Sequence, residues 1–421
     1  MVYQSKSLFG RAAGWPRAGC GFDLWYTTAT LAAAAMIPLS RRVAPLLSVF
    51  LAFGVAFPGR AADPAVRAVP PRAEKLLVTE ATQPAEYRYT AFPVALRVGP
   101  DEVWIVYKAG KTHATDAGAA LEVVRHSLSS GTTELIQRLP APAPKLYQMG
   151  EIARLPDGTI AIYVDVQAVG WDGRHYRAGA EFFRWDETRR AFGAPEPFPL
   201  VAGVRYGYPF EFVSAGRTTW QLVMKFGYMQ GGRWGVDVLR SDDAGRSWNF
   251  VRDLTEEFGR IPANESGFVR HGDGWIVTTR GYDSIARLHR TDAEFKLLRQ
   301  RDLTGPTPYI QKLIGRPRLL IRDGKGYLLG RNWTEPNPTA KGAAAKPMQL
   351  CLIRFDLETL APEACVILDN ADHRRVTDGY YAVAEFSGSG ADELMHIITY
   401  RGLAGAPPAI VRLDFRWADV K

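Results

Sequence analysis

Strongly apolar segments of the chain occur in pairs, and a short polar turn separates the two members of each pair. Within a segment, apolar and polar residues alternate with a period of two, which is typical of a β-strand with one buried face. The turns contain Asp-Gly or similar sequences that favour tight hairpins. Six such hairpins are predicted, at residues 94–108, 151–166, 211–226, 266–280, 318–332 and 383–401. Long amphipathic helical periodicity is missing from the sequence, so we expect an all-β protein.

A second motif lies between the hairpins. Residues 241–248, SDDAGRSW, fit the pattern Ser-x-Asp-x-Gly-x-x-Trp. In such a turn the aspartate accepts backbone N–H groups, the glycine takes a conformation with positive φ, and the tryptophan packs inward. We therefore interpret the motif as structural. Weaker versions lie at 127–134, 185–192, 291–298 and 355–362.

The hairpins recur at intervals of roughly 50–70 residues. Six four-stranded units at this spacing favour one six-bladed β-propeller that closes around a central axis. A β-sandwich would have fewer strands and no such period. No linker rich in proline and serine and no run of charge divides residues 85–421. We expect the propeller to span 85–421, with residues 63–84 as an N-terminal extension.

The N-terminal region has the pattern of an export signal. Two arginines precede an uncharged apolar run at residues 43–57, and small residues follow it up to Ala61 and Ala62. This order is typical of a secretory signal peptide, and the run is shorter than the roughly 18–20 residues that span a bilayer. We expect residues 1–62 to be a leader, with Met36 as a candidate start and cleavage near Ala61 or Ala62. The mature chain would be secreted or periplasmic, and the alternative is a buried apolar helix or a membrane anchor.

Charge argues against a nucleic-acid partner. The chain has 421 residues, of which 52 are basic and 44 acidic, for a formal net charge of +8. Six basic residues and one acidic residue give residues 1–62 a charge of +5, so +3 remains on the expected mature chain. Because the basic excess lies mostly in the leader, we predict no nucleic-acid partner and no membrane partner after cleavage. Nucleotide-binding loops and zinc signatures are missing from the sequence, so we expect no organic cofactor and no metal site.

Two cysteines, Cys351 and Cys365, lie outside the leader and flank a predicted hairpin turn. In an oxidising compartment they could form a disulfide across two antiparallel strands. The alternative is two small buried apolar residues.

In a propeller the inner strand of each blade begins near the axis, where loops of neighbouring blades converge. This geometry predicts a ring of carboxylates, cations and tyrosines, as acid–base chemistry on an anionic substrate requires. The starts of the inner strands contribute Glu151, Tyr208, Glu265, Arg318 and Tyr380, and the following strand ends and loops contribute Lys108, His113, Asp116, Arg280 and Arg331.

Two segments of this ring resemble the sialidase (neuraminidase) superfamily, whose Asp-box or BNR repeat the 241–248 motif also resembles. Residues 264–281, NESGFVRHGDGWIVTTRG, are similar to the stretch in which a glutamate opens a strand and an arginine follows the turn. Residues 378–386, DGYYAVAEF, resemble the segment that carries the family's nucleophilic tyrosine. The resemblance implies that Glu265 is the catalytic glutamate and Arg280 a carboxylate-binding arginine. It places the nucleophile at Tyr380, with Tyr381 one step away, and the general acid/base at Asp116.

The arginines depart from the family's pattern. The family's first arginine precedes an Ile-Pro pair, whereas here Ala91 precedes Phe92-Pro93. Arg88 lies three residues earlier, a shift that places a side chain on the other face of a strand. The third arginine is open between Arg318, Arg331 and Lys346. Such a site would bind sialic acid, a uronic acid or another acidic sugar.

The resemblance therefore implies an exo-α-sialidase-type glycoside hydrolase that cleaves terminal acidic sugars from glycans, and the leader implies that it is exported. We expect a monomer. Lys108, His113, Tyr208, Glu151 and the arginines would contact the substrate. One alternative is a propeller-fold polysaccharide lyase, in which His113 and either Tyr208 or Tyr380 act as base and acid while Arg280 neutralises a uronate carboxylate. The other alternative is a non-catalytic propeller that binds glycans.

Overall fold

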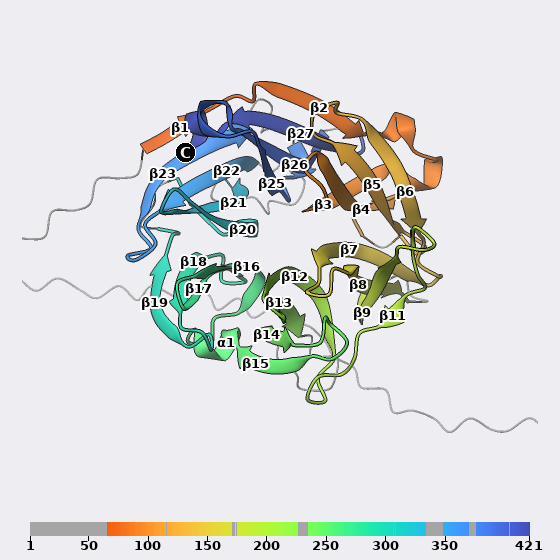
Figure 1. Ribbon diagram of the computed structural model, residues 1–421, viewed down its shortest axis with the longest axis horizontal. Helices are drawn as coiled ribbons and strands as arrows, with labels where there is room; N and C mark the ends of the chain where they lie inside the picture. Colours follow the sequence, from red (N-terminus) through yellow and green to blue (C-terminus); the bar gives the residue numbers. More distant parts are fainter. Residues whose placement is uncertain are drawn as a thin grey trace, which may run out of the picture. The chain divides into compact units, whose positions relative to one another are not determined.

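The alternating segments form antiparallel strands, and the described residues build six sheets around a central axis, as Figure 1 shows. The predicted six-bladed, all-β propeller is therefore confirmed. The computed structural model describes residues 65–114, 116–170, 173, 175–225, 235–305, 307, 309–333, 348–369, 376–403 and 405–421. The predicted leader and signal peptide lie outside these residues. The described residues belong to one compact unit.

Each blade contains four main strands, which follow one another side by side from the axis to the rim. The first blade consists of β3 (Tyr89–Arg97), β4 (Glu102–Gly110), β5 (Ala120–Ser127) and β6 (Thr133–Leu139). The second consists of β7 (Lys145–Arg154), β8 (Ile160–Val169), β9 (His175–Asp186) and β10 (Ala191–Phe192), with β11 (Glu196–Pro197) also on β9. The third consists of β12 (Tyr206–Ala215), β13 (Thr218–Lys225), β14 (Gly235–Ser241) and β15 (Asn249–Asp253).

The other three blades follow the same order. The fourth consists of β16 (Ala263–His271), β17 (Gly274–Gly281), β18 (Ala286–Thr291) and β19 (Leu297–Asp302). The fifth consists of β20 (Ile314–Arg322), β21 (Lys325–Trp333), β22 (Met348–Phe355) and β23 (Pro362–Asp369). The sixth has β24 (Val376–Gly379) and β25 (Val383–Ser387) beside β26 (Leu394–Leu403) and β27 (Ala409–Arg416). Short helical turns occur at α1 (Leu254–Glu257), α2 (Trp417–Val420), η1 (Glu80–Thr82), η2 (Ala85–Tyr87) and η3 (Gly390–Asp392).

Two strands from the N-terminal part of the described residues join blades formed by the C-terminal part. The strand β2 (Ala73–Val78) pairs with β27 as the outermost strand of the sixth blade, and β1 (Ala65–Ala68) runs parallel to β23 in the fifth blade. These strands fall in the range expected as an N-terminal extension, so part of that range belongs to the blades. Pairing covers edges of β27 and β23 that would otherwise carry unpaired backbone groups.

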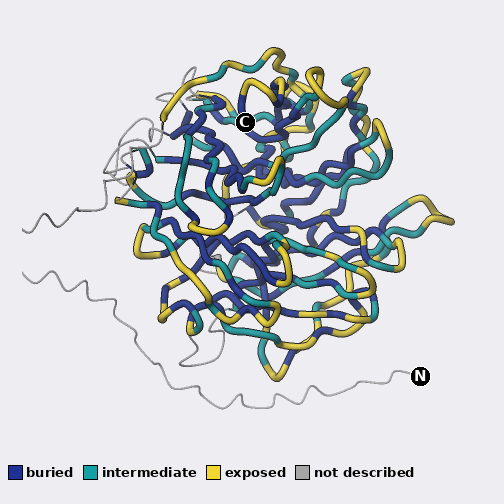
Figure 2. Tube along the Cα trace, turned by 60° about the vertical axis from the view of Figure 1, so that its left-hand side comes forward, coloured by how far each residue is buried: buried dark blue, intermediate teal, exposed yellow. Residues whose placement is uncertain are grey.

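Buried residues follow the strands, and exposed residues concentrate at the turns (Figure 2). In the turn at 241–248, Asp243 Oδ1 accepts the N–H groups of Arg246 and Ser247 at 3.1 and 2.9 Å, and Gly245 has φ 73°. Trp248 is buried in a cluster of aromatic rings. Three further turns between third and fourth strands have an aspartate that accepts backbone N–H groups, at Asp186, Asp292 and Asp356.

The two cysteines are free thiols in the structure. Cys351 lies on β22 and Cys365 on β23, and both side chains are buried in one apolar cluster. Burial raises the pKa of both thiols. The two cysteines therefore pack as small apolar residues do. Among the described residues, no helix combines the length and the hydrophobicity needed to span a membrane.

The inner strands contain an irregularity at the end where they approach the axis. There the inner strand has at least one residue more than its partner, which is the mark of a β-bulge. The register shifts lie between Ala91 and Val94, Tyr147 and Met149, Tyr206 and Glu211, Ala263 and Ser266, and Gly315 and Arg318. In the sixth blade the break between β24 and β25 has the same effect, because both strands pair with β26. These bulges determine which side chains face the axis.

Candidate active site

Glu265, near the start of β16, is the centre of a buried polar cluster. Its side chain is almost inaccessible, with the residue 3% exposed. Oε1 accepts hydrogen bonds from the hydroxyl groups of Tyr381 and, at 2.9 Å, Tyr208. Oε2 accepts from Arg280 Nη1 at 2.6 Å and from the backbone N–H of Arg316 at 2.7 Å. Donors from the third, fourth, fifth and sixth blades thus converge on one carboxylate.

The charges around this cluster separate the protonation states of Glu265 and Tyr381. Burial raises the pKa of Glu265, but the nearby Arg280 and Arg331 guanidinium groups and the hydrogen bonds outweigh it and lower the pKa to about 2. Burial and the Glu265 charge raise the pKa of Tyr381 to about 12, although the two arginines oppose this rise. Near neutral pH, a neutral phenol therefore donates to an ionised carboxylate. This is the arrangement of a nucleophile beside its base.

Three arginines surround the pair. Arg280, at the end of β17, keeps 22% of its side chain exposed while it binds Glu265. The Arg331 guanidinium, on β21, lies 5.0 Å from the centre of the Tyr381 ring. Arg177, on β9, lies 5.2 Å from the centre of the Tyr208 ring and keeps 27% of its side chain exposed. These cations come from the second, fourth and fifth blades, and Arg177 also pairs with Asp165 at 2.5 Å.

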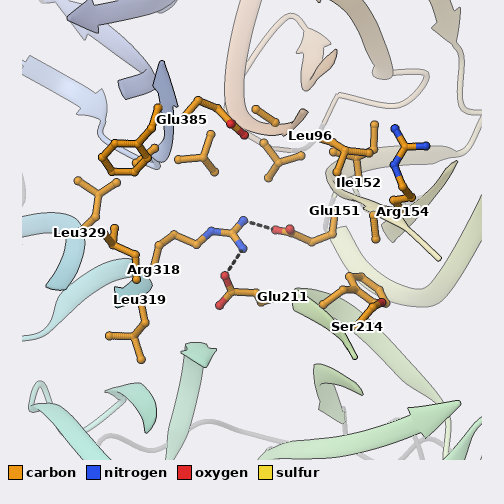
Figure 3. Close-up of a pocket in the computed structure, with 18 residues that line it drawn as sticks. Leu96, Glu151, Ile152, Arg154, Glu211, Ser214, Arg318, Leu319, Leu329 and Glu385 are labelled. Atoms are coloured by element: carbon orange, nitrogen blue, oxygen red, sulfur yellow. Dashed lines mark hydrogen bonds and ion pairs between the residues drawn. The ribbon is translucent and has the colours of Figure 1, made fainter. Parts of the chain in front are cut away.

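A second charged cluster adjoins the first through Arg316, whose side chain contacts Glu151. Arg318 Nη2 is 2.6 Å from Glu151 Oε1, and Arg318 Nη1 is 3.5 Å from Glu211 Oε1. Arg316 also contacts Glu151 and donates to the carbonyl of Phe210 at 2.8 Å. Figure 3 shows Arg318 between the two carboxylates. Arg318 and Glu151 are therefore engaged with each other.

This second cluster faces a cavity of about 340 Å³ along the axis of the propeller. Inner strands of five blades form most of its wall, through residues after their bulges, whereas Glu265 lies near the start of β16, which supplies none of the lining. Much of the lining is apolar, as Figure 3 shows for Leu96, Ile152, Leu319 and Leu329. The cavity is thus separate from the Tyr381–Glu265 pair.

The loop after β4 is anchored by a buried ion pair. Lys108 Nζ is 2.8 Å from Asp116 Oδ1, and it also donates to the carbonyls of Thr112 and His113 at 2.8 and 3.0 Å. Asp116 Oδ2 accepts the N–H groups of Lys111 and Thr112 at 2.8 and 3.2 Å. One oxygen of Asp116 is therefore bound to Lys108, and the other is bound to the backbone of its own loop.

His113 is at the exposed side of this loop. Its side chain is 58% exposed, and its Nδ1 is 2.6 Å from Asp378 Oδ2. The Tyr89 hydroxyl contacts both groups. The imidazole packs edge-on against Phe92, with 5.0 Å between ring centres, and the Tyr381 ring lies 5.3 Å from the same Phe92 ring. His113 and Tyr381 thus share one aromatic neighbour.

Comparisons with known proteins show which solved structures share this fold. No protein-family model matches the sequence, and no curated protein matches it. Among solved structures, a protein of unknown function from Dyadobacter fermentans is similar with a TM-score of 0.62 at 14% identity, over 82% of this chain and 98% of that one. A variant of the NanB sialidase of Streptococcus pneumoniae is similar with a TM-score of 0.59 at 10% identity, over 82% and 71% of the chains. The Hadza microbial sialidase Hz136 has a TM-score of 0.56 at 9% identity, over 83% and 70%. The fold is that of sialidases.

Within this sialidase-like propeller, Tyr380 and Tyr381 point to different surroundings. Tyr380 is fully buried in the apolar cluster of the fifth and sixth blades and has φ 69°. Burial and the nearby Asp369 raise its pKa. Tyr381, the next residue, donates to Glu265. The tyrosine expected to contact the glutamate is therefore displaced by one position, because the chain bulges there.

The other predicted residues fall into three groups. The structure brings Tyr208, Arg280 and Arg331 to the Glu265 cluster. It places Asp116 and His113 in the neighbouring loop, Lys108 on β4 as the anchor of that loop, and Glu151 and Arg318 at the axial cavity. Sequence analysis missed Arg177, Arg316 and Asp378, although Asp378 opens the tyrosine segment. Within the described ranges, no three His, Cys, Asp or Glu side chains are grouped as ligands for a metal ion.

Proposed function

We propose that the chain is a sialidase-like glycoside hydrolase that removes a terminal acidic sugar from a glycan, with Tyr381 as nucleophile and Glu265 as its base. The observation that carries this proposal is the hydrogen bond from the buried Tyr381 hydroxyl to the ionised Glu265, beside the partly exposed Arg280. A carboxylate nucleophile would be repelled by the sugar's own carboxylate, whereas a neutral phenol is not. Tyrosine nucleophiles are a known exception among glycosidases.

In the first step, the substrate carboxylate binds Arg280 and Arg331 through charge-assisted hydrogen bonds. The Tyr381 oxygen attacks the anomeric carbon, its proton passes to Glu265, and the bond to the leaving oxygen breaks. The two arginines lower the pKa of Glu265 in the free protein. A bound carboxylate offsets their charge, so Glu265 becomes a stronger base when the substrate is present.

The residue at the position of the family's first arginine is not an arginine, so we define the substrate by its acidic group and not as sialic acid alone. Ala91 stands there, fully buried at the bulge of β3. Arg280 and Arg331 therefore lack that partner, and Arg177 is the third cation nearby. We propose an acidic sugar as the substrate class, with sialic acid and uronic acids as members to be compared.

The full-length protein is tested with 4-methylumbelliferyl glycosides of sialic acid, glucuronic acid, iduronic acid and galactose, with the neutral galactoside as the substrate control. We expect fluorescence from at least one acidic glycoside and none from the galactoside. A product with a new C–C double bond would instead support a lyase. Affinity for acidic glycans without any release would support a binding protein.

A second experiment identifies the nucleophile. A derivative of the accepted sugar with fluorine on the anomeric carbon, as leaving group, and on the adjacent ring carbon is expected to leave an adduct that peptide mass spectrometry locates on Tyr381. Tyr381→Phe should abolish both adduct and turnover. Tyr163→Phe is the matched control, since this hydroxyl is buried away from the site and has no hydrogen-bond partner among the described residues. An adduct on Tyr380 would contradict the assignment.

A further inference from the structure

A hydrolase of the proposed kind needs a group that protonates the leaving oxygen and later deprotonates water. Asp116 is held away from this task, because its two oxygens accept hydrogen bonds from Lys108, Lys111 and Thr112 within the loop after β4. His113, in the same loop, has a mostly exposed imidazole. The two residues of this loop thus differ in their availability to a substrate.

His113 is held at both its backbone and its side chain. Its carbonyl accepts hydrogen bonds from Lys108 Nζ at 3.0 Å and from Gln148 Nε2 at 2.7 Å. Its Nδ1 is 2.6 Å from Asp378 Oδ2. Tyr400, on β26, donates to the other oxygen of Asp378 at 2.7 Å. The imidazole therefore has a defined orientation despite its exposure.

Asp378 determines which nitrogen of the ring exchanges protons. Burial raises the pKa of Asp378, but hydrogen bonds from His113, Tyr89 and Tyr400 outweigh it and lower the pKa to about 2. An ionised carboxylate accepts the Nδ1–H of the ring, so Nε2 remains to hold or release a proton. A carboxylate orients a catalytic histidine in serine hydrolases in the same way.

The position of His113 also fits the site. Its ring and that of Tyr381 pack on one Phe92 ring, at 5.0 and 5.3 Å. Arg331 Nη1 is 4.0 Å from Asp378 Oδ1 and lies beside the Tyr381 ring. The imidazole, its carboxylate, the cation and the phenol thus belong to one continuous cluster.

We propose that His113, oriented by Asp378, is the general acid and base of the proposed hydrolase. In the first step Tyr381 bonds to the anomeric carbon and gives its proton to Glu265, the bond from that carbon to the leaving oxygen breaks, and the imidazolium Nε2 gives its proton to the leaving oxygen. In the second step water bonds to the anomeric carbon and gives a proton to Nε2. The bond to Tyr381 breaks, and the phenolate recovers its proton from Glu265. This inference rests on the proposed function.

The test compares two glycosides of the same accepted sugar, one with an activated aryl leaving group and one with a sugar leaving group. Removal of a general acid matters most for the leaving group that needs protonation. His113→Ala is therefore expected to lower turnover of the sugar-linked substrate by about 10²–10⁴-fold, and attack on the aryl glycoside much less. With the aryl glycoside, added azide should restore turnover of His113→Ala and yield the glycosyl azide, because azide needs no base.

Two variants serve as comparisons. Asp116→Ala loosens the loop, so we expect it to lower turnover of both substrates by the same factor and to gain nothing from azide. His271→Ala should leave both rates unchanged, since His271 lies at the far end of β16 and pairs with Glu358. Circular dichroism and thermal unfolding check that each variant folds.

The outcomes separate the two proposals. If the wild-type protein is active and His113→Ala lowers turnover of both substrates by the same factor, the role of His113 is overturned and the proposed function stands. Azide rescue of Asp116→Ala in place of His113→Ala would also overturn that role. Failure of the wild-type protein to release either aglycone would overturn the proposed function and this inference together.

Discussion

From the charge of Glu265 we predict how the stability of the fold depends on pH, and this prediction does not depend on catalysis. Its pKa falls from its ordinary 4.5 to about 2, since the arginines and hydrogen bonds outweigh burial. Because the folded pKa is the lower one, the unfolded chain binds more protons between these two values. The stabilisation is therefore present above about pH 4.5 and is lost as the pH falls towards 2.

The size of the effect follows from these two pKa values. Above pH 5 the carboxylate contributes about 3 kcal/mol to the free energy of unfolding, and at pH 3 about 1 kcal/mol remains. Glu265→Gln keeps the size of the side chain but leaves Arg280 and Arg331 without the carboxylate. We expect this variant to be less stable than the wild type by about 3 kcal/mol at pH 7 and by about 1 kcal/mol at pH 3.

The assay is urea unfolding, followed by tryptophan fluorescence between pH 3 and pH 7. Glu211→Gln is the matched control, because burial raises the pKa of Glu211 despite the neighbouring Arg318. A raised folded pKa reverses the sign, so the wild type should gain stability relative to this variant as the pH falls. A difference between wild type and Glu265→Gln that stays the same from pH 7 to pH 3 would refute the reasoning.

Three further substitutions test the site and the fold. Arg280→Met should raise KM for an acidic glycoside by about 10–100-fold, as charge-assisted bonds are lost, but not KM for the methyl ester of the same sugar; equal effects on both in steady-state kinetics would exclude a carboxylate contact. Lys108→Met leaves Asp116 buried without its cation, so we expect a loss of about 3–5 kcal/mol in urea unfolding and faster amide exchange around His113. An unchanged midpoint would show that the ion pair does not anchor the loop. Trp248→Ala should cost about 3–5 kcal/mol, measured as a lower unfolding midpoint, without loss of strand content by circular dichroism.

The blades could be predicted from the sequence because their signal is local. Alternation and turn chemistry are properties of ten to twenty consecutive residues, and each predicted hairpin corresponds to the two inner strands of a blade. The range 318–332, for example, covers most of β20 and β21. The outermost strand of the sixth blade could not be found in this way. Residues 73–78 become β2 only by pairing with β27, which is more than 300 residues away in the chain.

The site could be predicted only in part, because the inner strands bulge where they approach it. In the sixth blade, Gly379 pairs with Arg401 and Val383 with Ile398, so four steps along one strand match three along the other. One extra residue reverses which alternate side chains face the axis. Tyr380 takes the left-handed conformation that accommodates the extra residue, and Tyr381 faces Glu265. Neither propensity nor periodicity reveals a bulge of this kind.

The expected position of the first arginine and the expected position of the acid–base group lie in the same blade. Ala91 and Phe92 lie at the bulge of β3, and His113 and Asp116 lie in the loop after its neighbour β4. All four therefore belong to the first blade, whereas Glu265, Arg280, Arg331 and Tyr381 belong to the last three. Phe92 takes φ 58° at the bulge, and its ring contacts both His113 and Tyr381. A change in the first blade can therefore alter the surroundings of His113 and Phe92 while the Tyr381–Glu265 pair, which the later blades supply, stays in place.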